Sequence, residues 1–333
     1  MKSGSILVIG AGAWGTALAL VLARNGRQTL LSDVNAEHID KLIAERCNNR
    51  HLHGVDFPAE LQPVHEYQPL PEAVSHIVIA SPCAALRQVL QGLQPYQQQP
   101  FKLCLACKGL EPGSLSLSHA IVAEYLPDTP LAILSGPSFA AEVAAGLPTA
   151  VTLAAPERQV AAEFAELFHD ELFRIYTHDD VVGVQVGGAV KNVMAIAAGI
   201  ADGLGCGANT RAALIARGLA EIMRLGIAMG GRADTFMGLA GLGDLVLTCT
   251  DDLSRNRRFG LALAQGKTPQ QAGEEIGQVI EGLRTVSVVC KLAAVHKIEM
   301  PISEQVLKVV NAEVSPRQAV AKLLARDRKE EGG

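Results

Sequence analysis

The ammonium group of Lys191 is the only charge in an apolar stretch that runs from residue 181 to residue 201. Read as a helix from about residue 184, the stretch places Gly187 and Gly188 one turn before the lysine, on the same face. Two glycines weaken a helix, so they indicate that another part of the chain approaches that face closely. Burial can lower the pKa of a lysine far enough for the side chain to transfer protons. Lys191 is therefore a candidate acid or base; the alternative is a lysine whose head reaches water from the edge of a core helix.

Two further polar clusters follow in the chain. The segment 254–258, SRNRR, packs three arginines into four positions, and the guanidinium group suits phosphate oxygens. Asp244 follows the glycine-rich run 240–243, and Thr248 lies four residues later on the same helix face. The first cluster predicts anion binding, or else a solvated basic turn. Asp244 predicts a site residue, or else an ordinary helix cap.

A glycine turn begins the chain: residues 5–15 read SILVIGAGAWG, a short strand followed by G-A-G-A-W-G and an alanine- and leucine-rich helix. Such a turn lets a backbone approach a pyrophosphate, which then sits at the helix N-terminus. Asp33 ends the next strand, 28–32, roughly 20 residues on, where a ribose-binding carboxylate belongs. Because a carboxylate there repels a 2′-phosphate, the sequence favours NAD over NADP.

These side chains need an alternating α/β scaffold to position them. Strand-like segments are expected at 76–80, 101–106, 131–134 and 150–154, with helical patterns such as 84–93 and 116–125 between them. This alternation predicts a parallel, doubly wound sheet with ligands at the carboxyl ends of its strands. Lys108 and the segment 135–138, SGPS, lie just past such ends, although Lys108 could be an ordinary loop lysine.

The second half of the chain changes to helices with small-residue turns. Helical patterns cover 212–229, 279–296, 303–310 and 316–326, and the charged residues 326–333 are expected to fray. We therefore predict an N-terminal Rossmann-like α/β domain, residues 1–182, followed by an all-α domain, residues 183–333.

Composition excludes several classes. Hydrophobic residues at 49% and charged residues at 19% are typical of a well-buried globular protein. A net charge of −5 gives no basic field for nucleic acid. Glycines break the apolar N-terminal run in two, so we expect neither a targeting segment nor a membrane span. Seven irregularly spaced cysteines form no disulfide framework, which fits a cytoplasmic protein.

No metal site is expected. In a strand, Cys104 and Cys107 point to opposite faces, so this single C-x-x-C is interpreted as buried packing. His51 and His53 lie in the polar segment NNRHLHG, without acidic or cysteine partners at ligand spacing, and are interpreted as part of a solvated loop.

Eight motifs, in order from about residue 6 to residue 284, closely resemble bacterial NAD(P)-dependent glycerol-3-phosphate dehydrogenases. They are LVIGAGAWGTALA, CKGLE, SGPSFAAEVAAGLPTA, VGGAVKNV, GANTRAALI, GLAGLGDLVLTCT, SRNRRFG and IGQVIEG. The resemblance implies reversible oxidation of sn-glycerol 3-phosphate to dihydroxyacetone phosphate with NAD or NADP, usually run toward glycerol 3-phosphate for phospholipid synthesis. It also implies a homodimer.

The resemblance assigns roles residue by residue. Lys191 matches the proton donor and acceptor, and Asp244 would orient it. Substrate-side matches are Lys108, Gly136, Ser138, Asn192, Thr248, Ser254, Arg255 and Asn256. The cofactor side comprises Gly10, Gly12, Ala13, Trp14, Gly15, Asp33, Lys108, Ala140, Arg255, Val279 and Glu281. Relatives that use NADPH often lack an acid at the position of Asp33, which supports NAD and leaves NADP possible.

Two rival functions share parts of this pattern. A 3-hydroxy-acid dehydrogenase would keep the glycine turn without needing the arginines of 254–258. A non-catalytic NADH sensor would not need Lys191, Asp244 and Arg255 together. In the favoured reading, substrate would draw the two domains together.

Overall fold

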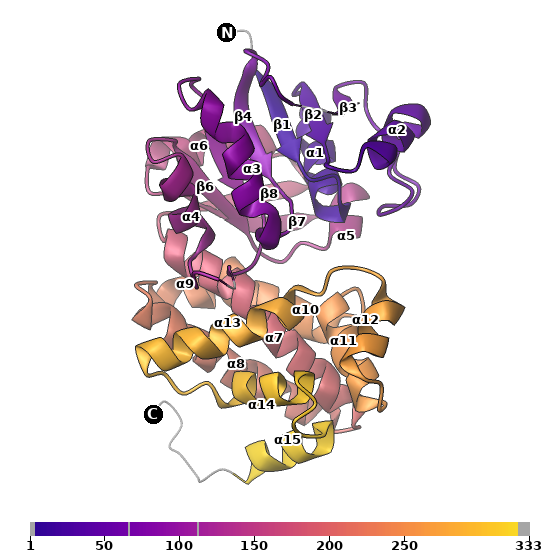
Figure 1. The fold of residues 1–333 in the computed structure, drawn as a ribbon, viewed down its shortest axis with the longest axis vertical. Helices are drawn as coiled ribbons and strands as arrows, with labels where there is room; N and C mark the ends of the chain where they lie inside the picture. Colours follow the sequence, from indigo (N-terminus) through magenta and orange to yellow (C-terminus); the bar gives the residue numbers. More distant parts are fainter. Residues whose placement is uncertain (1–3, 66, 112, 326–333) are drawn as a thin grey trace.

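The computed structural model describes residues 4–65, 67–111 and 113–325. Figure 1 shows a sheet covered by helices in one half and a group of helices in the other. This arrangement confirms the predicted fold class, a Rossmann-like α/β half followed by an all-helical half. All of residues 181–325 are described, and they contain no strand.

The sheet has eight strands in the order β3-β2-β1-β4-β5-β6-β7-β8. Their bounds are β1 Ser5–Ile9, β2 Thr29–Ser32, β3 Leu61–Val64, β4 Val74–Ile79, β5 Lys102–Leu105, β6 Leu131–Ser135, β7 Thr149–Ala154 and β8 Phe173–His178. The edge strands β3 and β8 escaped prediction because a proline interrupts LQPV and because polar residues interrupt FRIYTH.

The prediction of a wholly parallel sheet is wrong for β7, which pairs antiparallel with β6. After Ser135 the chain passes only the short helix α5 (Ala140–Ala144) before it enters β7. A parallel connection needs a crossover that returns to the other end of the sheet, and no such crossover exists here. Strand β8 pairs parallel with β7 and therefore also runs against the other six.

Alternate strand residues build a core on each face of the sheet. One core joins Val8, Leu31 and Cys104 to helices α1 (Ala13–Arg24), α2 (Ala36–Glu45) and α6 (Arg158–Phe168). The other joins Ile79 and Leu105 to α3 (Leu86–Leu93) and α4 (Ser118–Tyr125), with the short turns η1 (Cys83–Ala85) and η2 (Gln94–Tyr96) at the ends of α3. Two buried faces explain the continuous apolar strands in the sequence.

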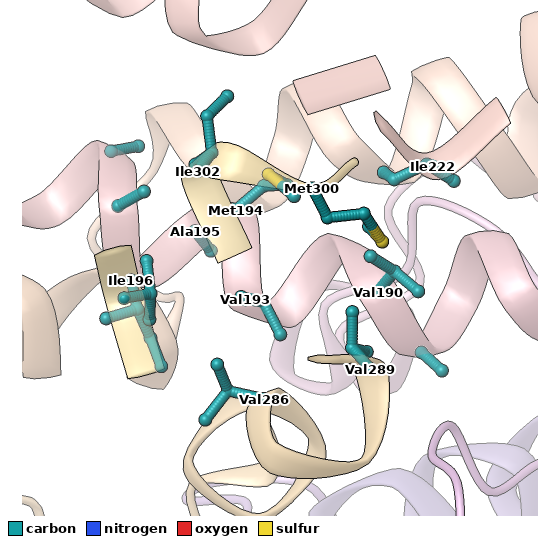
Figure 2. Close-up of a cluster of buried hydrophobic side chains, with 14 of the residues drawn as sticks. Val190, Val193, Met194, Ala195, Ile196, Ile222, Val286, Val289, Met300 and Ile302 are labelled. Carbon is teal, nitrogen blue, oxygen red and sulfur yellow. The ribbon is translucent and has the colours of Figure 1, made fainter. Parts of the chain in front are cut away.

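Helix α7 (Val181–Gly203) is the centre of the helical half, and almost all of its residues are buried. Figure 2 shows its Val190 and Val193 beside Val286 and Val289 of α13 (Glu281–His296), in a cluster that also contains Met300. By length and hydropathy α7 could cross a membrane, but 94% of its most apolar window is buried inside the protein.

The remaining helices surround α7. They are α8 Gly207–Ala228, α9 Ala233–Met237, a π-helical turn Leu239–Gly243, α10 Asp244–Thr250, α11 Arg255–Ala264, α12 Pro269–Ile276, α14 Pro301–Val310 and α15 Pro316–Leu324. Helix α8 begins five residues earlier than the predicted 212. The predicted frayed tail, 326–333, lies outside the described residues.

Candidate active site

The ammonium group of Lys191 lies inside the protein, on the middle turns of α7. It donates hydrogen bonds to the carboxylate of Asp244 and, at 2.9 Å, to the hydroxyl oxygen of Thr248. Only 7% of Lys191 is exposed. The alternative of a lysine head in water is therefore wrong.

Asp244 carries a second lysine on its other oxygen. The Lys108 ammonium, beyond β5, donates to Asp244 Oδ2 at 2.8 Å and to the carbonyl of Gly136 at 2.8 Å. The buried carboxylate thus joins one lysine from each half of the chain. Ser138 bonds the same Gly136 carbonyl at 3.0 Å, so the SGPS turn and Lys108 form one unit.

Burial and neighbouring charge act against each other at these groups. Burial lowers the pKa of Lys191 to about 8; Asp244 opposes this shift, and the positive Lys108 adds to it. Burial also disfavours the charged form of Asp244, but the two ammonium groups outweigh it and lower the pKa of that carboxyl. Asp244 therefore stays ionised while Lys191 can titrate near pH 8.

The glycines before Lys191 allow the close approach that the sequence suggested. A Cβ atom at Gly188 would lie 2.6 Å from the Ser135 hydroxyl oxygen, at the end of β6. A Cβ atom at Gly187 would lie 2.6 Å from the carbonyl of Ala240, in the π-helical turn before Asp244. Both contacts are shorter than side chains tolerate, so glycine lets α7 pack against the two segments that bring Lys108 and Asp244 to Lys191.

The helix-cap alternative for Asp244 is also wrong. Gly243 occupies the cap position of α10, without a side-chain hydrogen bond, and Asp244 is the first helical residue. Its side chain points to the lysines, and Thr248 donates back to its carbonyl at 2.6 Å. Asp244 and Thr248 therefore share a helix face because both bind the Lys191 ammonium.

The basic segment 254–258 divides into two functions. Arg257 is buried and pairs with Asp202 at 2.7 Å and with Asp252, so its charge is neutralised. Arg255 and Arg258 are exposed. Ser254 caps α11 by accepting from the Arg257 amide at 3.2 Å. Arg255, at the N-terminus of α11, is thus the exposed arginine nearest to free helix N–H groups.

Asn192 and Asn256, both expected to face the substrate, bond to each other. The Asn256 amide donates to Asn192 Oδ1 at 2.9 Å, and Asn256 Oδ1 accepts from the Gly282 amide at 2.9 Å. Together they tie α7, α11 and α13 beside the lysine. A Cβ atom at Gly282 would lie 2.7 Å from the Asn192 carbonyl, which accounts for glycine there.

The glycine turn has the geometry of a nucleotide cradle. Gly10 adopts φ +109°, a region that favours glycine, and a Cβ atom at Gly15 would lie 1.8 Å from the Gly10 carbonyl oxygen. A Cβ atom at Gly12 would meet nothing within 4 Å. Gly12 caps α1 without any side-chain hydrogen bond, so open space lies beside unsatisfied helix N–H groups. The residues present fit a dinucleotide pyrophosphate.

Asp33 holds the cradle in place. Its Oδ2 accepts from the Ala11 amide at 2.8 Å, and its Oδ1 accepts from the Asn35 amide at 3.0 Å. A carboxylate has further lone pairs for a ribose hydroxyl. These bonds form a contact set of their own, separate from the one around Lys191.

The other cofactor-side residues lie on the ends of different elements. Trp14 begins α1 beside Ala13 and donates from Nε1 to the Ala106 carbonyl at 3.1 Å, past the end of β5. Ala140 and Glu281 are the first residues of α5 and α13, and Val279 is partly buried just before α13. Burial raises the pKa of Glu281, while Arg284 and Arg255 oppose the shift.

The segment NNRHLHG is only partly the solvated loop that we expected. His53 is exposed, but Asn48 is buried and donates to the Ala11 carbonyl at 3.0 Å and to Thr16 Oγ1 at 2.8 Å. The His51 ring lies edge-on to His38, with 5.3 Å between ring centroids. The sequence could not predict these contacts, because a loop is held by single polar atoms and leaves no periodic pattern. Within the described ranges, no group of three or more His, Cys, Asp or Glu residues could hold a metal ion.

Comparison with known proteins identifies the family. The family model described as NAD-dependent glycerol-3-phosphate dehydrogenase N-terminus matches residues 5–161, and the corresponding C-terminus model matches residues 180–321. The chain is 52% identical to glycerol-3-phosphate dehydrogenase [NAD(P)+] of Nitrosococcus oceani, over 98% of this chain and 95% of that one. It is 50% identical to the protein of the same name from Bartonella henselae, over 99% and 98% of the two chains.

A solved structure supports the same conclusion. The crystal structure of glycerol-3-phosphate dehydrogenase from Coxiella burnetii superposes with a TM-score of 0.94 at 46% identity, covering 97% of this chain and 99% of that chain. Both halves, the glycine cradle and the helices around Lys191, are therefore matched by sequence and by fold. This chain belongs to the NAD-dependent glycerol-3-phosphate dehydrogenase family.

Proposed function

We propose that the chain interconverts sn-glycerol 3-phosphate and dihydroxyacetone phosphate, with Lys191 as general acid and base. By family it is an NAD(P)-dependent oxidoreductase. The observation that supports the catalytic role is the buried Lys191 ammonium, held by Asp244 and Thr248 with its pKa lowered to about 8. A group that titrates near the working pH is well suited to move a proton in both directions.

The nicotinamide cofactor, when bound, supplies or accepts the hydride. As the ketone carbon is reduced, negative charge grows on its oxygen, and Lys191 stabilises that charge and donates the proton. Asp244 orients Lys191 through one oxygen and Lys108 through the other. Lys108 thereby adds a second positive charge beside the developing anion. In the reverse direction, neutral Lys191 accepts the proton of the alcohol.

For the substrate phosphate we propose Arg255 and the N-terminus of α11, with Ser254 as the cap that orders it. Gly136 and Ser138 would act by holding Lys108 in position, because both Lys108 and Ser138 donate to the Gly136 carbonyl. Asn192 and Asn256 act by keeping α7 and α11 in register, because their side chains already bond each other. Thr248 fixes the lysine.

For the cofactor we propose the cradle of Gly10, Gly12, Ala13, Trp14 and Gly15. In this proposal Asp33 would bind the ribose, and the cofactor site would be completed by Lys108, Ala140, Arg255, Val279 and Glu281. The open space beside Gly12 supports the pyrophosphate position. The relatives are named for both NAD and NADP, and we propose that Asp33 shifts this chain toward NAD.

Three coarser features complete the proposal. The domain division at 182/183 falls in the first turn of α7, which follows the last strand directly. A cytoplasmic location is supported by seven cysteines that are all free thiols. The homodimer implied by resemblance is tested by light scattering of the purified protein, and a monomeric mass would exclude it.

The first experiment measures NADH consumption with dihydroxyacetone phosphate, and then repeats it with Lys191→Ala. We expect turnover to fall by at least about 10²-fold because proton transfer is lost. Affinity for NADH, measured by its fluorescence, should stay unchanged because Lys191 lies away from the glycine cradle. Loss of NADH binding would show that Lys191 is structural. Turnover of 3-hydroxy acids instead, or no turnover of any ketone, would favour the rival functions.

The cofactor preference is tested by comparing NADH with NADPH, in wild type and in Asp33→Asn. We expect kcat/KM to favour NADH in wild type, and the variant to gain on NADPH because the charge that repels a 2′-phosphate is gone. The asparagine side chain of the variant keeps one oxygen for the Ala11 amide, so the cradle should persist. Equal use of both cofactors by wild type would contradict the role of Asp33 and leave the enzyme assignment intact.

A further inference from the structure

Two cysteines that are distant in sequence meet beside the active site. Cys83 follows β4 and Cys107 follows β5, and these strands are parallel neighbours that pair Ile79 with Leu105. Their carboxyl ends therefore deliver both residues to one edge of the sheet. Each thiol shifts the pKa of the other, and Cys83 Sγ lies 4.0 Å from Ser118 Oγ.

Cys104 takes no part in this pair. It belongs to the core on one face of the sheet, with α1 and α6, whereas Cys107 packs against the core on the other face. The expectation that the C-x-x-C thiols diverge is therefore correct. The partner of Cys107 comes from the neighbouring strand.

The thiol pair lies under the segment that carries Lys108. Cys107 directly precedes Lys108, and on the other side a Cβ atom at Gly109 would lie 2.9 Å from Cys83 Sγ and 3.4 Å from Glu281 Oε2. Residues 107–109 therefore lie across Cys83, next to the first residue of α13. A covalent change at either sulfur moves the backbone that positions the Lys108 ammonium on Asp244 and Gly136.

We propose that Cys83 and Cys107 form a redox modification site, in which a peroxide joins them as a disulfide and turnover falls because Lys108 leaves Asp244. Residue Cys107 is half-buried whereas residue Cys83 is buried, so in this proposal the peroxide reacts with Cys107 first. The Cys107 thiolate attacks the peroxide, an S–O bond forms, the O–O bond breaks and one water leaves after protonation. Cys83 then attacks the Cys107 sulfur, the S–S bond forms, the S–O bond breaks, and the hydroxide leaves as a second water with the proton of the Cys83 thiol.

The two thiols are chemically unequal in the direction this order requires. The interaction with Cys83 lowers the pKa of Cys107, and the same interaction together with burial raises the pKa of Cys83. Glu281 disfavours the thiolate of both. Two electrons leave the thiols and reduce the peroxide, and a small dithiol such as dithiothreitol reverses the step.

The test treats the full-length protein with hydrogen peroxide and maps its peptides by mass without reduction. We expect a Cys83–Cys107 cross-link, a loss of most NADH-oxidising turnover, and recovery of both after dithiothreitol. Absence of that cross-link under conditions that oxidise exposed methionines would overturn the proposal. The cross-link is read by mass alone, so its outcome does not depend on whether the proposed reaction is right.

Variants separate the disulfide from other oxidation. Cys83→Ser removes the resolving thiol, so Cys107 should stop at sulfenic acid and be trapped by dimedone, while wild type gives no adduct. Cys107→Ser should form neither the disulfide nor the sulfenic acid. Cys290→Ser, a partly buried thiol on α13, is the matched control and should respond as wild type does. Equal, dithiothreitol-reversible inactivation of wild type and of both Cys83→Ser and Cys107→Ser would show that the disulfide is not the cause.

Discussion

At the scale of residues, one buried carboxylate controls two cations. Asp244 is 1% exposed, and each of its oxygens meets a different lysine. Two positive charges against one negative charge leave the cluster positive, in surroundings where electrostatic interactions are strong. That residual charge suits an oxygen that becomes negative during ketone reduction. Removing one lysine would cancel it, so the pair acts as a unit.

The lowered pKa of Lys191 gives the two reaction directions opposite pH profiles. Ketone reduction needs the protonated lysine, so its kcat should be constant below about pH 8 and fall above it. Alcohol oxidation needs the neutral lysine, so its kcat should rise through the same range. Initial rates over a pH series, measured with saturating substrates in each direction, check this prediction.

A matched variant makes the assignment specific. Thr248→Val removes one hydrogen bond to Lys191 and preserves the shape of the side chain. Because that bond favours the charged lysine, both profiles should shift to lower pH together. Profiles that stay in place, or that move in opposite directions, would assign the titration to another group.

At the scale of elements, the contact between α7 and α11 determines how far Lys191 lies from Arg255. A Cβ atom at Gly199 would lie 2.0 Å from the Arg257 carbonyl, and one at Gly260 would lie 2.1 Å from the Ile196 carbonyl. The two helix backbones therefore touch through glycines. Together with the hydrogen bond from Asn256 to Asn192, this contact places the N-terminus of α11 beside the turn of α7 that contains Lys191.

Gly199→Ala should push α11 away from α7, because its added methyl group meets backbone. We expect the free energy of unfolding to fall by about 1–3 kcal/mol and KM for dihydroxyacetone phosphate to rise more than KM for NADH. Urea denaturation and steady-state kinetics measure the two effects.

Gly273→Ala is the control, because a Cβ atom at Gly273 in α12 would meet nothing within 4 Å. It should leave both KM values unchanged and stabilise by up to about 1 kcal/mol through helix propensity. An equal loss in both variants would show that the close contact is not what α7 and α11 require.

At the scale of the whole molecule, several hydrogen bonds besides those of Lys108 connect the sheet half to the helical half. Asp180 caps α7 through Gly183 and also accepts from Thr235 Oγ1 at 2.6 Å. Gln185, on α7, accepts from the amide of His119 on α4 at 3.1 Å. The first turns of α7 are therefore fixed to both halves.

Stability of the chain should depend on pH through one buried acid, Glu221 of α8. It accepts from the Ile302 and Ser303 amides at 2.6 and 3.2 Å, at the start of α14. Burial raises its pKa from 4.5 to about 7, against these hydrogen bonds. The folded state then binds the proton more tightly, so this stabilisation is complete below about pH 4.5 and is lost as pH rises through 7. The total is about 3 kcal/mol.

Urea midpoints of wild type and Glu221→Gln, measured from about pH 5 to pH 8, test this dependence. The stability of wild type relative to Glu221→Gln should fall as pH rises through 7, because wild type then carries a buried charge whereas glutamine does not titrate. Comparing midpoints avoids a two-state assumption for a chain with two halves. A wild-type stability that stays constant or increases with pH, relative to the variant, would contradict the prediction.

Local patterns in the sequence were sufficient for much of this molecule. The glycine turn, six of the strands and the apolar helix around Lys191 follow from the spacing of neighbouring residues, which the backbone geometry of strands and helices reads directly. The pair of glycines before Lys191 also predicted a close contact, because glycine destabilises a helix and is expected there only where another segment packs closely. Resemblance supplied the chemistry that those patterns serve.

The tertiary structure alone decided which distant groups meet. Only the fold shows that β7 pairs antiparallel with β6 and that Asp244 joins Lys108 to Lys191. It also shows that the side-chain oxygen of Asn192 accepts a hydrogen bond from Asn256. Only strand order brings Cys107 to Cys83 and not to its sequence neighbour Cys104. The physical reason is the same in each case. Periodicity fixes which face of an element a side chain occupies, whereas its partner depends on how separate elements pack, and that packing is determined by the whole chain.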